Sequence, residues 1–114
     1  MGKKGAKLTE GATLISEQLE CSLADFGDIS RRKMFGGYGV FESGVMFALV
    51  SSEGGVYLKV TDINREQFEK AGSQKFGRMP YFSIPHEILD DNSSLCKWAK
   101  SSIEVAHEEK TNKR

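Results

Sequence analysis

Residues 38–60 read YGVFESGVMFALVSSEGGVYLKV and decide the fold class. Two short glycine-containing connections, Ser43-Gly44 and Glu53-Gly54-Gly55, separate three apolar runs in this stretch. Because such connections suit β-hairpins, the stretch predicts consecutive antiparallel strands. The middle run, Val45–Ser51, is apolar on both faces, which is typical of a central strand that is covered on both sides.

Other extended segments flank this middle run. In Val56–Val60 the aliphatic residues alternate with Tyr57 and Lys59. The face of the strand that carries Lys59 is therefore expected to meet solvent or a partner. Arg31–Phe35 is a further candidate strand, just before the glycines. Met79–Ile84 contains Pro80, which has no amide donor, so this strand should lie at an edge of the sheet or begin at the proline.

The first helix is expected near the N-terminus. Leu8 opens an apolar stripe that continues to Phe26 at spacings of three and four residues. This spacing predicts a helix of about 17 residues, because residues three and four apart share one helix face. Thr9 suits its N-cap, and Gly27 suits the left-handed position after its end.

Two further helices are expected in the C-terminal half. Asp62 is positioned to cap a helix over Ile63–Ala71, which Gly72 ends. The third helix follows the acidic and polar residues 90–93, which favour a helix N-terminus. Its buried face is expected to contain Leu95, Trp98, Ala99, Ser102, Ile103 and Ala106.

Together these elements predict an α+β domain in which helices pack on an antiparallel sheet as two layers. The expected order is α-β(3–4)-α-β(1–2)-α. A chain of 114 residues has room for one domain, which we expect to span residues 8–107. Residues 1–7 and 108–114 are rich in lysine or charge, and we expect them to be frayed.

The charge balance and the lack of long apolar runs argue against some classes of protein. The 16 basic residues balance the 16 acidic residues, whereas a domain that grips nucleic acid usually carries a basic excess. No apolar run approaches the roughly 18 residues of a membrane-spanning helix, so we expect a cytoplasmic protein without membrane contact. Cys21 and Cys96 are therefore expected to be reduced and buried as small apolar residues.

Candidate catalytic and metal-ligating residues are few. His86 and His107 lie in different predicted elements, without a second His or Cys at ligand spacing. Asp90-Asp91 is the most suggestive acidic pair, but adjacent carboxylates before a helix usually act as caps. An enzymatic alternative requires a pocket lined by Asp90, Asp91 or His86. We predict instead a protein that is not an enzyme and has no cofactor and no metal.

The glycines of Met34–Gly39 invite comparison with a phosphate-binding loop. The pattern G-x-G-x-x-G would use Gly37 and Gly39 but requires a glycine at position 42, which is Glu42. A strand, and not a helix N-terminus, is expected to follow. The glycines are more consistent with a bulge, a positive φ angle or a close approach of two backbones.

Residues 31–33 form the compact basic cluster of the predicted folded part. On a strand, Arg31 and Lys33 share one face and Arg32 points to the other. One interpretation is an edge strand that charge protects from aggregation. The other is an anchor for phosphates or for an acidic partner surface, and Lys59 is a further candidate contact for a partner or for nucleic acid.

Aromatic residues of the predicted strands and last helix could stack on nucleic-acid bases only if they lay side by side on an uncovered sheet face. Because helices are expected to flank the strands, core packing is the favoured interpretation. The residues concerned are Tyr57, Tyr81, Phe82 and Trp98.

Residues 31–39, Arg-Arg-Lys-Met-Phe-Gly-Gly-Tyr-Gly, are the most distinctive motif of the chain. They resemble the Arg-Arg-x-Met-Phe-Gly-Gly-x-Gly signature of the TfoX (Sxy) N-terminal domain family of bacterial competence regulators. Gly44–Leu49 and Val56–Lys59 match the next two strands of that family, and the resemblance extends from about Leu8 to Ala106. Its structural signature positions here are Met34, Phe35, Gly36, Gly37, Gly39 and Trp98.

The resemblance implies a helix–sheet fold like that of the type III secretion chaperones, which commonly dimerise. It also implies a regulatory domain without enzymatic activity, linked to transcription of competence and DNA-uptake genes. We therefore expect a homodimer with a protein partner in the transcription machinery or an activator, and residues 31–33 and Lys59 as candidate contacts. The alternative is a direct nucleic-acid-binding module that uses the basic strand Arg31–Lys33 and binds weakly.

Overall fold

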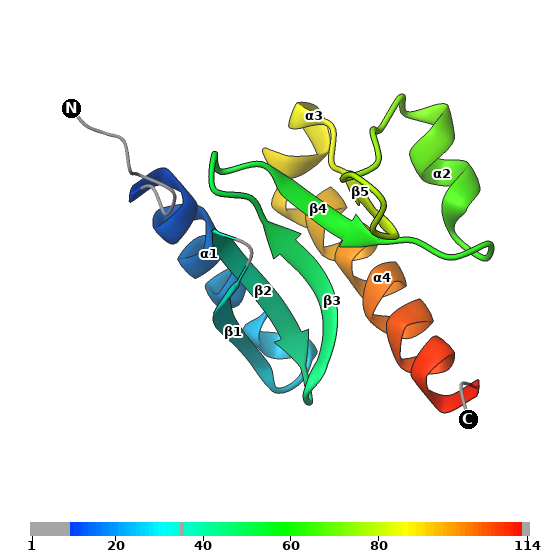
Figure 1. The fold of residues 1–114 in the computed structure, drawn as a ribbon, viewed down its shortest axis with the longest axis horizontal. Helices are drawn as coiled ribbons and strands as arrows, with labels where there is room; N and C mark the ends of the chain where they lie inside the picture. The colour runs from blue at the N-terminus through cyan, green and yellow to red at the C-terminus, as the bar shows by residue number, and fades with distance from the viewer. Residues whose placement is uncertain (1–9, 35, 113–114) are drawn as a thin grey trace.

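The sheet is an antiparallel meander of five strands in chain order. The computed structural model describes residues 10–34 and 36–112. Each strand pairs with the next along the chain (Figure 1), and the last one begins immediately after Pro80, as its missing amide donor predicted. The strands are β1 (Ile29–Met34), β2 (Gly37–Glu42), β3 (Val45–Val50), β4 (Val56–Lys59) and β5 (Tyr81–Ser83).

The helices form a second layer. α1 packs against β1 and β2, and α4 packs against β3 and β4. Figure 1 shows α1 beside the β1–β2 part of the meander and α4 beside the β3–β4 part, with α2 beyond β5. The predicted α+β class, with helices packed on an antiparallel sheet, is confirmed. The helices are α1 (Glu10–Ser22), the 3-10 helix η1 (Ala24–Phe26), α2 (Arg65–Lys70), α3 (His86–Leu89) and α4 (Asn92–Asn112).

The core lies between the sheet and the pair formed by α1 and α4. Val40, Ala48 and Leu58 are direct neighbours across β2, β3 and β4, and all three are buried. The same apolar cluster includes Leu19 of α1 and Ala99 of α4. Because one continuous apolar surface is buried, the sheet and both helices stabilise one another.

The central strand β3 is covered on both faces over its second half, Phe47–Val50. Ala48 and Leu49 are adjacent in the strand and therefore point to opposite sides of the sheet. Each is only 1% exposed. The prediction that this apolar run forms a central strand is confirmed, but the double coverage that we expected holds only for Phe47–Val50, since Val45 and Met46 are partly exposed.

Glycines let the chain approach itself closely around the β1–β2 connection. Gly36 adopts a φ angle of 77°, which residues with a side chain rarely adopt. A Cβ atom at Gly37 would lie 1.9 Å from the carbonyl oxygen of Val50, so a side chain there would overlap the backbone of β3. A Cβ atom at Gly39 would lie 2.6 Å from Sδ of Met34, whose side chain occupies that space. The signature residue between β1 and Gly36, Phe35, lies outside the described residues.

The first helix is shorter than its apolar stripe predicted. α1 ends at Ser22, and η1 carries the chain to Gly27. Phe26, which we expected on the buried stripe, is 38% exposed. The 3-10 helix has three residues per turn, so it rotates the side chains that follow away from the buried face of α1. The predicted cap Thr9 lies outside the described residues.

The second helix begins at Arg65, later than predicted. Asp62 does not cap it, since its Oδ1 atom pairs with Nη1 of Arg65 at 2.5 Å. Asn64 stands directly before the helix, and its side-chain oxygen accepts a hydrogen bond from the amide of Thr61 at 2.8 Å. Gly72 follows the helix with a φ angle of 77°, as predicted for the residue that ends it.

The C-terminal part contains more helix than predicted. His86–Leu89 forms a short helix, α3, for which we expected no helix. α4 continues to Asn112, so most of the charged segment that we expected to fray is helical. The reason lies in Glu109, whose carboxylate pairs with Lys59 of β4 and ties the last turns of the helix to the sheet.

The cysteine prediction was wrong for Cys21. Its side chain is exposed, whereas that of Cys96 is half-buried, and both are free thiols. Leu19 and Leu23 are four residues apart and define the buried row of α1. Cys21 lies midway between them in sequence and therefore points away from the core.

Candidate functional site

The two edges of the sheet differ. The segment 74–76 lies along the outer edge of β5, where the Phe76 amide donates to the Tyr81 carbonyl at 2.8 Å. The Ser83 amide donates in turn to the Gln74 carbonyl at 2.9 Å. Within residues 10–34 and 36–112, backbone hydrogen bonds join β1 only to β2. The outer edge of β1 therefore presents unpaired backbone donors and acceptors, and we take it as the candidate site.

The first basic residue of β1, Arg31, is bound within the molecule. Its Nε atom lies 2.9 Å from Oε1 of Glu20, and its Nη1 atom donates to the hydroxyl of Ser16 at 3.0 Å. The guanidinium also lies over the ring of Tyr38, and its Nη2 atom lies 3.4 Å from Oε2 of Glu17. Burial disfavours the charged form, but the hydrogen bonds to Glu20 and Tyr38 outweigh it and raise the pKa of Arg31. The guanidinium thus ties α1 to the sheet.

The next two basic residues, Arg32 and Lys33, are exposed. Neither forms an ion pair with any part of the chain that the structure describes. Arg32 lies on the sheet face opposite α1, with its guanidinium carbon 5.1 Å from the centre of the Phe41 ring. Lys33 shares the face of Arg31. The edge therefore offers one available cation on each face of β1.

The face of β1 and β2 opposite α1 carries a small apolar surface beside Arg32. We call it the open face, and it consists of Met34, Phe41 and Met46 around Gly39. A Cβ atom at Gly39 would lie within 3.3 Å of all three side chains, so the missing side chain lets them converge. Each of the three is partly exposed. Apolar contact is therefore available next to the charge of Arg32.

Lys59 does not present its charge to a partner. Its Nζ atom lies 2.5 Å from Oε1 of Glu109 and 5.6 Å from the centre of the Tyr81 ring, and the residue is 9% exposed. Lys59, which we expected to meet solvent or a partner, is thus buried and joined to α4 through Glu109. Burial, together with the charge of Glu109, raises the pKa of Tyr81 to about 12.

The aromatic side chains do not form a row on an uncovered sheet face. The ring of Phe68 lies between those of Phe82, at 6.1 Å, and Trp98, at 4.7 Å, and thereby joins α2 to β5 and α4. The ring of Tyr57 lies 4.8 Å from that of Phe76, at a tilt of 59°, and Phe76 belongs to the segment along the edge of β5. These pairs pack the fold, in agreement with the interpretation of the aromatics as packing residues.

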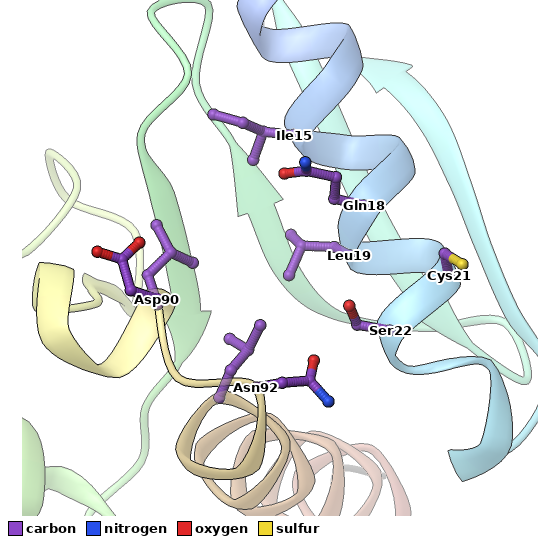
Figure 2. Close-up of a pocket in the computed structure, with 9 residues that line it drawn as sticks. Ile15, Gln18, Leu19, Cys21, Ser22, Asp90 and Asn92 are labelled. Atoms are coloured by element: carbon purple, nitrogen blue, oxygen red, sulfur yellow. The ribbon is translucent and has the colours of Figure 1, made fainter.

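A groove of about 490 Å³ lies between α1 and the start of α4 (Figure 2). Its floor is apolar, with Ile15 and Leu19 from α1 and Leu95 from α4, and its rim is polar. Figure 2 shows Cys21 pointing away from Asp90 across this groove. No base is bonded to Cys21 in the described part of the chain, so the groove lacks the paired nucleophile and base of covalent catalysis.

The other titratable candidates are separated. His86 is exposed at the start of α3, and Asp90 lies on the groove rim. Asp91 precedes α4, and its Oδ2 atom accepts a hydrogen bond from the Ser94 hydroxyl at 2.6 Å. Among the residues that the structure describes, no cluster of three or more His, Cys, Asp or Glu side chains could hold a metal ion.

A polar cluster that the sequence did not reveal surrounds Glu42. Its Oε1 atom lies 2.6 Å from Nε2 of His107, and its Oε2 atom accepts hydrogen bonds from the Ser43 hydroxyl and the Asp28 amide. The Ser43 hydrogen bond, helped by those from Asp28 and His107 and opposed by burial, lowers the pKa of Glu42. No local motif could show this cluster, because Glu42 and His107 are 65 residues apart in sequence.

Comparison with known proteins gives one family. The sequence model of the TfoX N-terminal domain matches residues 22–106. The matched range includes β1, the glycine-rich connection and most of α4. Comparison with curated proteins finds no match. Within the described residues, no helix has both the length and the apolar character needed to cross a membrane.

Proposed function

Since the chain belongs to the TfoX N-terminal domain family, we propose that it is a cytoplasmic regulatory domain that acts on transcription of competence genes through protein–protein contacts. The family is a non-enzymatic one with a competence-related regulatory role. The observation that carries the proposal is the difference between the two sheet edges. The edge at β5 is closed by residues 74–76, while no segment of the described residues pairs with the outer edge of β1, which carries Arg32 and Lys33.

Direct nucleic-acid binding is the competing hypothesis. It would use the basic cluster of β1 together with Lys59. However, the charges of Arg31 and Lys59 are neutralised by Glu20 and Glu109, which leaves two available cations of the four. A surface with few free cations makes few phosphate contacts, and phosphate contacts supply most non-specific affinity for nucleic acid.

We also propose the homodimer that the family resemblance implies, but through a surface other than the β1 edge. Pairing β1 with its own copy would place the run Arg31–Lys33 beside an identical run. Like charges directly opposite each other destabilise a strand pair. Light scattering after size-exclusion chromatography tests the proposal, and a single species of monomer mass at all concentrations would exclude a dimer.

The regulatory proposal is tested by a transcriptional reporter for a DNA-uptake gene in cells that express this chain or a variant. Arg32→Glu/Lys33→Glu reverses the two available charges and is expected to reduce reporter output to background. The matched control is Lys97→Glu/Lys100→Glu, which reverses two exposed lysines on α4, away from β1. Equal output from wild type and both variants would contradict a role for the β1 edge.

Loss of reporter output in Arg32→Glu/Lys33→Glu, together with loss of a steeply salt-dependent DNA binding that the wild type shows, would favour the competing hypothesis. Fluorescence anisotropy with a labelled duplex measures this directly. Under our proposal, affinity for the duplex at low salt is weak and does not differ between wild type and Arg32→Glu/Lys33→Glu by more than about tenfold.

A further inference from the structure

We infer that the partner of this domain contributes an extended acidic segment, which adds to the sheet as a new strand beside β1. The inference rests on the proposed function and gives the chemistry of the partner at that edge. It follows from three properties of β1: its unpaired backbone, the distribution of its charges over two faces, and the apolar surface next to one of them.

The backbone of β1 determines the form of the partner. β1 has six residues and pairs on one side only, with β2, among the residues that the structure describes. A strand edge binds most readily to another extended chain, because each of its unpaired amides and carbonyls then gains a hydrogen bond. A helix or a compact surface would leave those groups without partners.

The charges determine the partner's acidic character and the position of its acidic residues. Arg32 projects on the open face and Lys33 on the face of α1, so an added strand meets a cation on each face. The position beside Arg31 differs. Its charge is already paired with Glu17 and Glu20, which would repel a third carboxylate there. An added strand therefore matches the charges of β1 when two consecutive acidic residues lie opposite Arg32 and Lys33 and a neutral residue lies opposite Arg31.

The open face determines which kind of residue the partner places opposite Met34. Met34 lies two residues beyond Arg32 and on the same face, and its Sδ atom reaches over Gly39 toward Phe41. A residue directly opposite Met34 on an added strand would contact this apolar surface. The segment that fits β1 therefore reads apolar–acidic–acidic–neutral in the antiparallel orientation, and the reverse order in the parallel orientation.

A second copy of this chain does not fit the same edge. Its own β1 has basic residues where the segment requires acidic or neutral ones. The chain's own copy of the pattern, Leu89–Asn92, lies at the junction of α3 and α4 and is not extended. Glu17 and Glu20 lie on α1 and are bound to Arg31, so they cannot supply an extended acidic strand either. The charge of β1 thus selects a different protein and disfavours self-association through this edge.

The inference can be tested with labelled octapeptides and the full chain. Two peptides carry the central sequences Val-Glu-Asp-Thr and Thr-Asp-Glu-Val, one for each strand orientation. A third carries Lys-Lys in place of the acidic pair. Four further peptides repeat the first two with N-methyl groups at alternate backbone amides, each in both registers. N-methylation removes backbone hydrogen bonds while side chains and net charge stay the same, so it separates strand addition from simple charge attraction.

We expect one of the two acidic peptides to bind with a dissociation constant at or below about 1 mM, measured by fluorescence anisotropy. N-methylation in one register and Arg32→Glu/Lys33→Glu should each weaken binding by about tenfold or more. Lys97→Glu/Lys100→Glu should change it by less than about twofold. Hydrogen exchange of β1 amides should slow in the presence of the binding peptide, with no change for the amides of β5.

Three outcomes would overturn the inference. They are absence of binding by both acidic peptides, binding that N-methylation weakens in neither register, and equal binding by the Lys-Lys peptide. If one of these occurs while Arg32→Glu/Lys33→Glu still abolishes reporter output, strand addition fails and the proposed function stands. If reporter output is also unchanged, both fail. Dimers that form only in Arg32→Glu/Lys33→Glu would support the charge-based exclusion of a second copy.

Discussion

Nε of Arg31 lies 2.9 Å from Oε1 of Glu20, and this contact divides the basic run of β1 into two parts. One cation binds α1 to the sheet, and the two that follow remain available at the edge. Three consecutive basic residues thus have two different roles. The same stretch of sequence contributes to stability at Arg31 and, under our proposal, to recognition at Arg32 and Lys33.

Replacing Arg31 should destabilise the fold. Arg31→Ala removes the contacts to Glu20 and Tyr38 and leaves the buried Ser16 hydroxyl without one of its partners. We expect a loss of about 1–2 kcal/mol in the free energy of unfolding, less than for a fully buried network because Glu17 and Glu20 are partly exposed. Urea unfolding measures it. Arg32→Ala, the neighbouring control, should change the free energy by less than about 0.5 kcal/mol, and equal losses would refute the division of roles.

Gly37→Ala and Gly39→Ala should differ in severity. A Cβ atom at Gly37 meets the backbone oxygen of Val50, which cannot move without displacing β3. A Cβ atom at Gly39 meets the flexible end of Met34, which can rotate away. Gly37→Ala should therefore cost at least about 2 kcal/mol, and Gly39→Ala should cost less. Thermal unfolding compares the two. A milder effect at Gly37 would show that β2 and β3 are less closely apposed at this point.

The Glu42 cluster predicts a dependence of stability on acid pH. The folded-state pKa of Glu42 lies below its ordinary value of 4.5, so the unfolded chain binds the proton first as the pH falls. The contribution of Glu42 is then complete above about pH 5, shrinks below pH 4.5 and is lost as the pH falls through the lowered pKa. The difference in unfolding free energy between wild type and Glu42→Gln should follow this course.

This comparison is made a second time in a His107→Gln background, because the imidazole is a direct partner of Glu42. If the difference in unfolding free energy between wild type and Glu42→Gln grows as the pH falls from 5 to 3, the lowered pKa of Glu42 is contradicted.

Lys59→Met should leave peptide binding unchanged. Lys59 was a candidate contact by sequence, but its side chain lies under α4 with Glu109. Methionine has a similar length and apolar character, and Glu109 remains hydrated after the change because it is 45% exposed. We expect a change in stability of at most about 1 kcal/mol and dissociation constants within about twofold of wild type. A large loss of peptide binding in Lys59→Met would contradict this prediction and show that Lys59 contributes to the interface.

The fold class could be predicted from the sequence because each strand pairs with the strand next to it in the chain. Hairpins at Ser43-Gly44 and Glu53–Gly55 join neighbouring strands, so short-range turn chemistry sets the order of the meander. The sequence could not predict where α1 gives way to η1, since one apolar stripe is compatible with either helix. It also could not predict the length of α4, because its last turns are held by the distant Lys59.

The candidate site could be predicted only in part. The sequence identified Arg31–Lys33 as a basic strand, and alternation correctly separated Arg32 from its neighbours. It could not show that Glu20 neutralises Arg31, because that contact depends on how α1 packs on the sheet. It also could not show which edge is closed, since the pairing of residues 74–76 with β5 forms in a segment without strand periodicity.

The most direct test of the central claim is site-specific photo-crosslinking in cells. A benzophenone amino acid replaces Ser30, an exposed residue at the start of β1, or Lys97, an exposed residue of α4. We predict a crosslinked adduct with a different protein from position 30, lost on adding Arg32→Glu/Lys33→Glu, and none from position 97. Adducts from position 97 but not from position 30, or adducts at position 30 that survive the charge reversal, would contradict the assignment of β1 as the partner-binding edge.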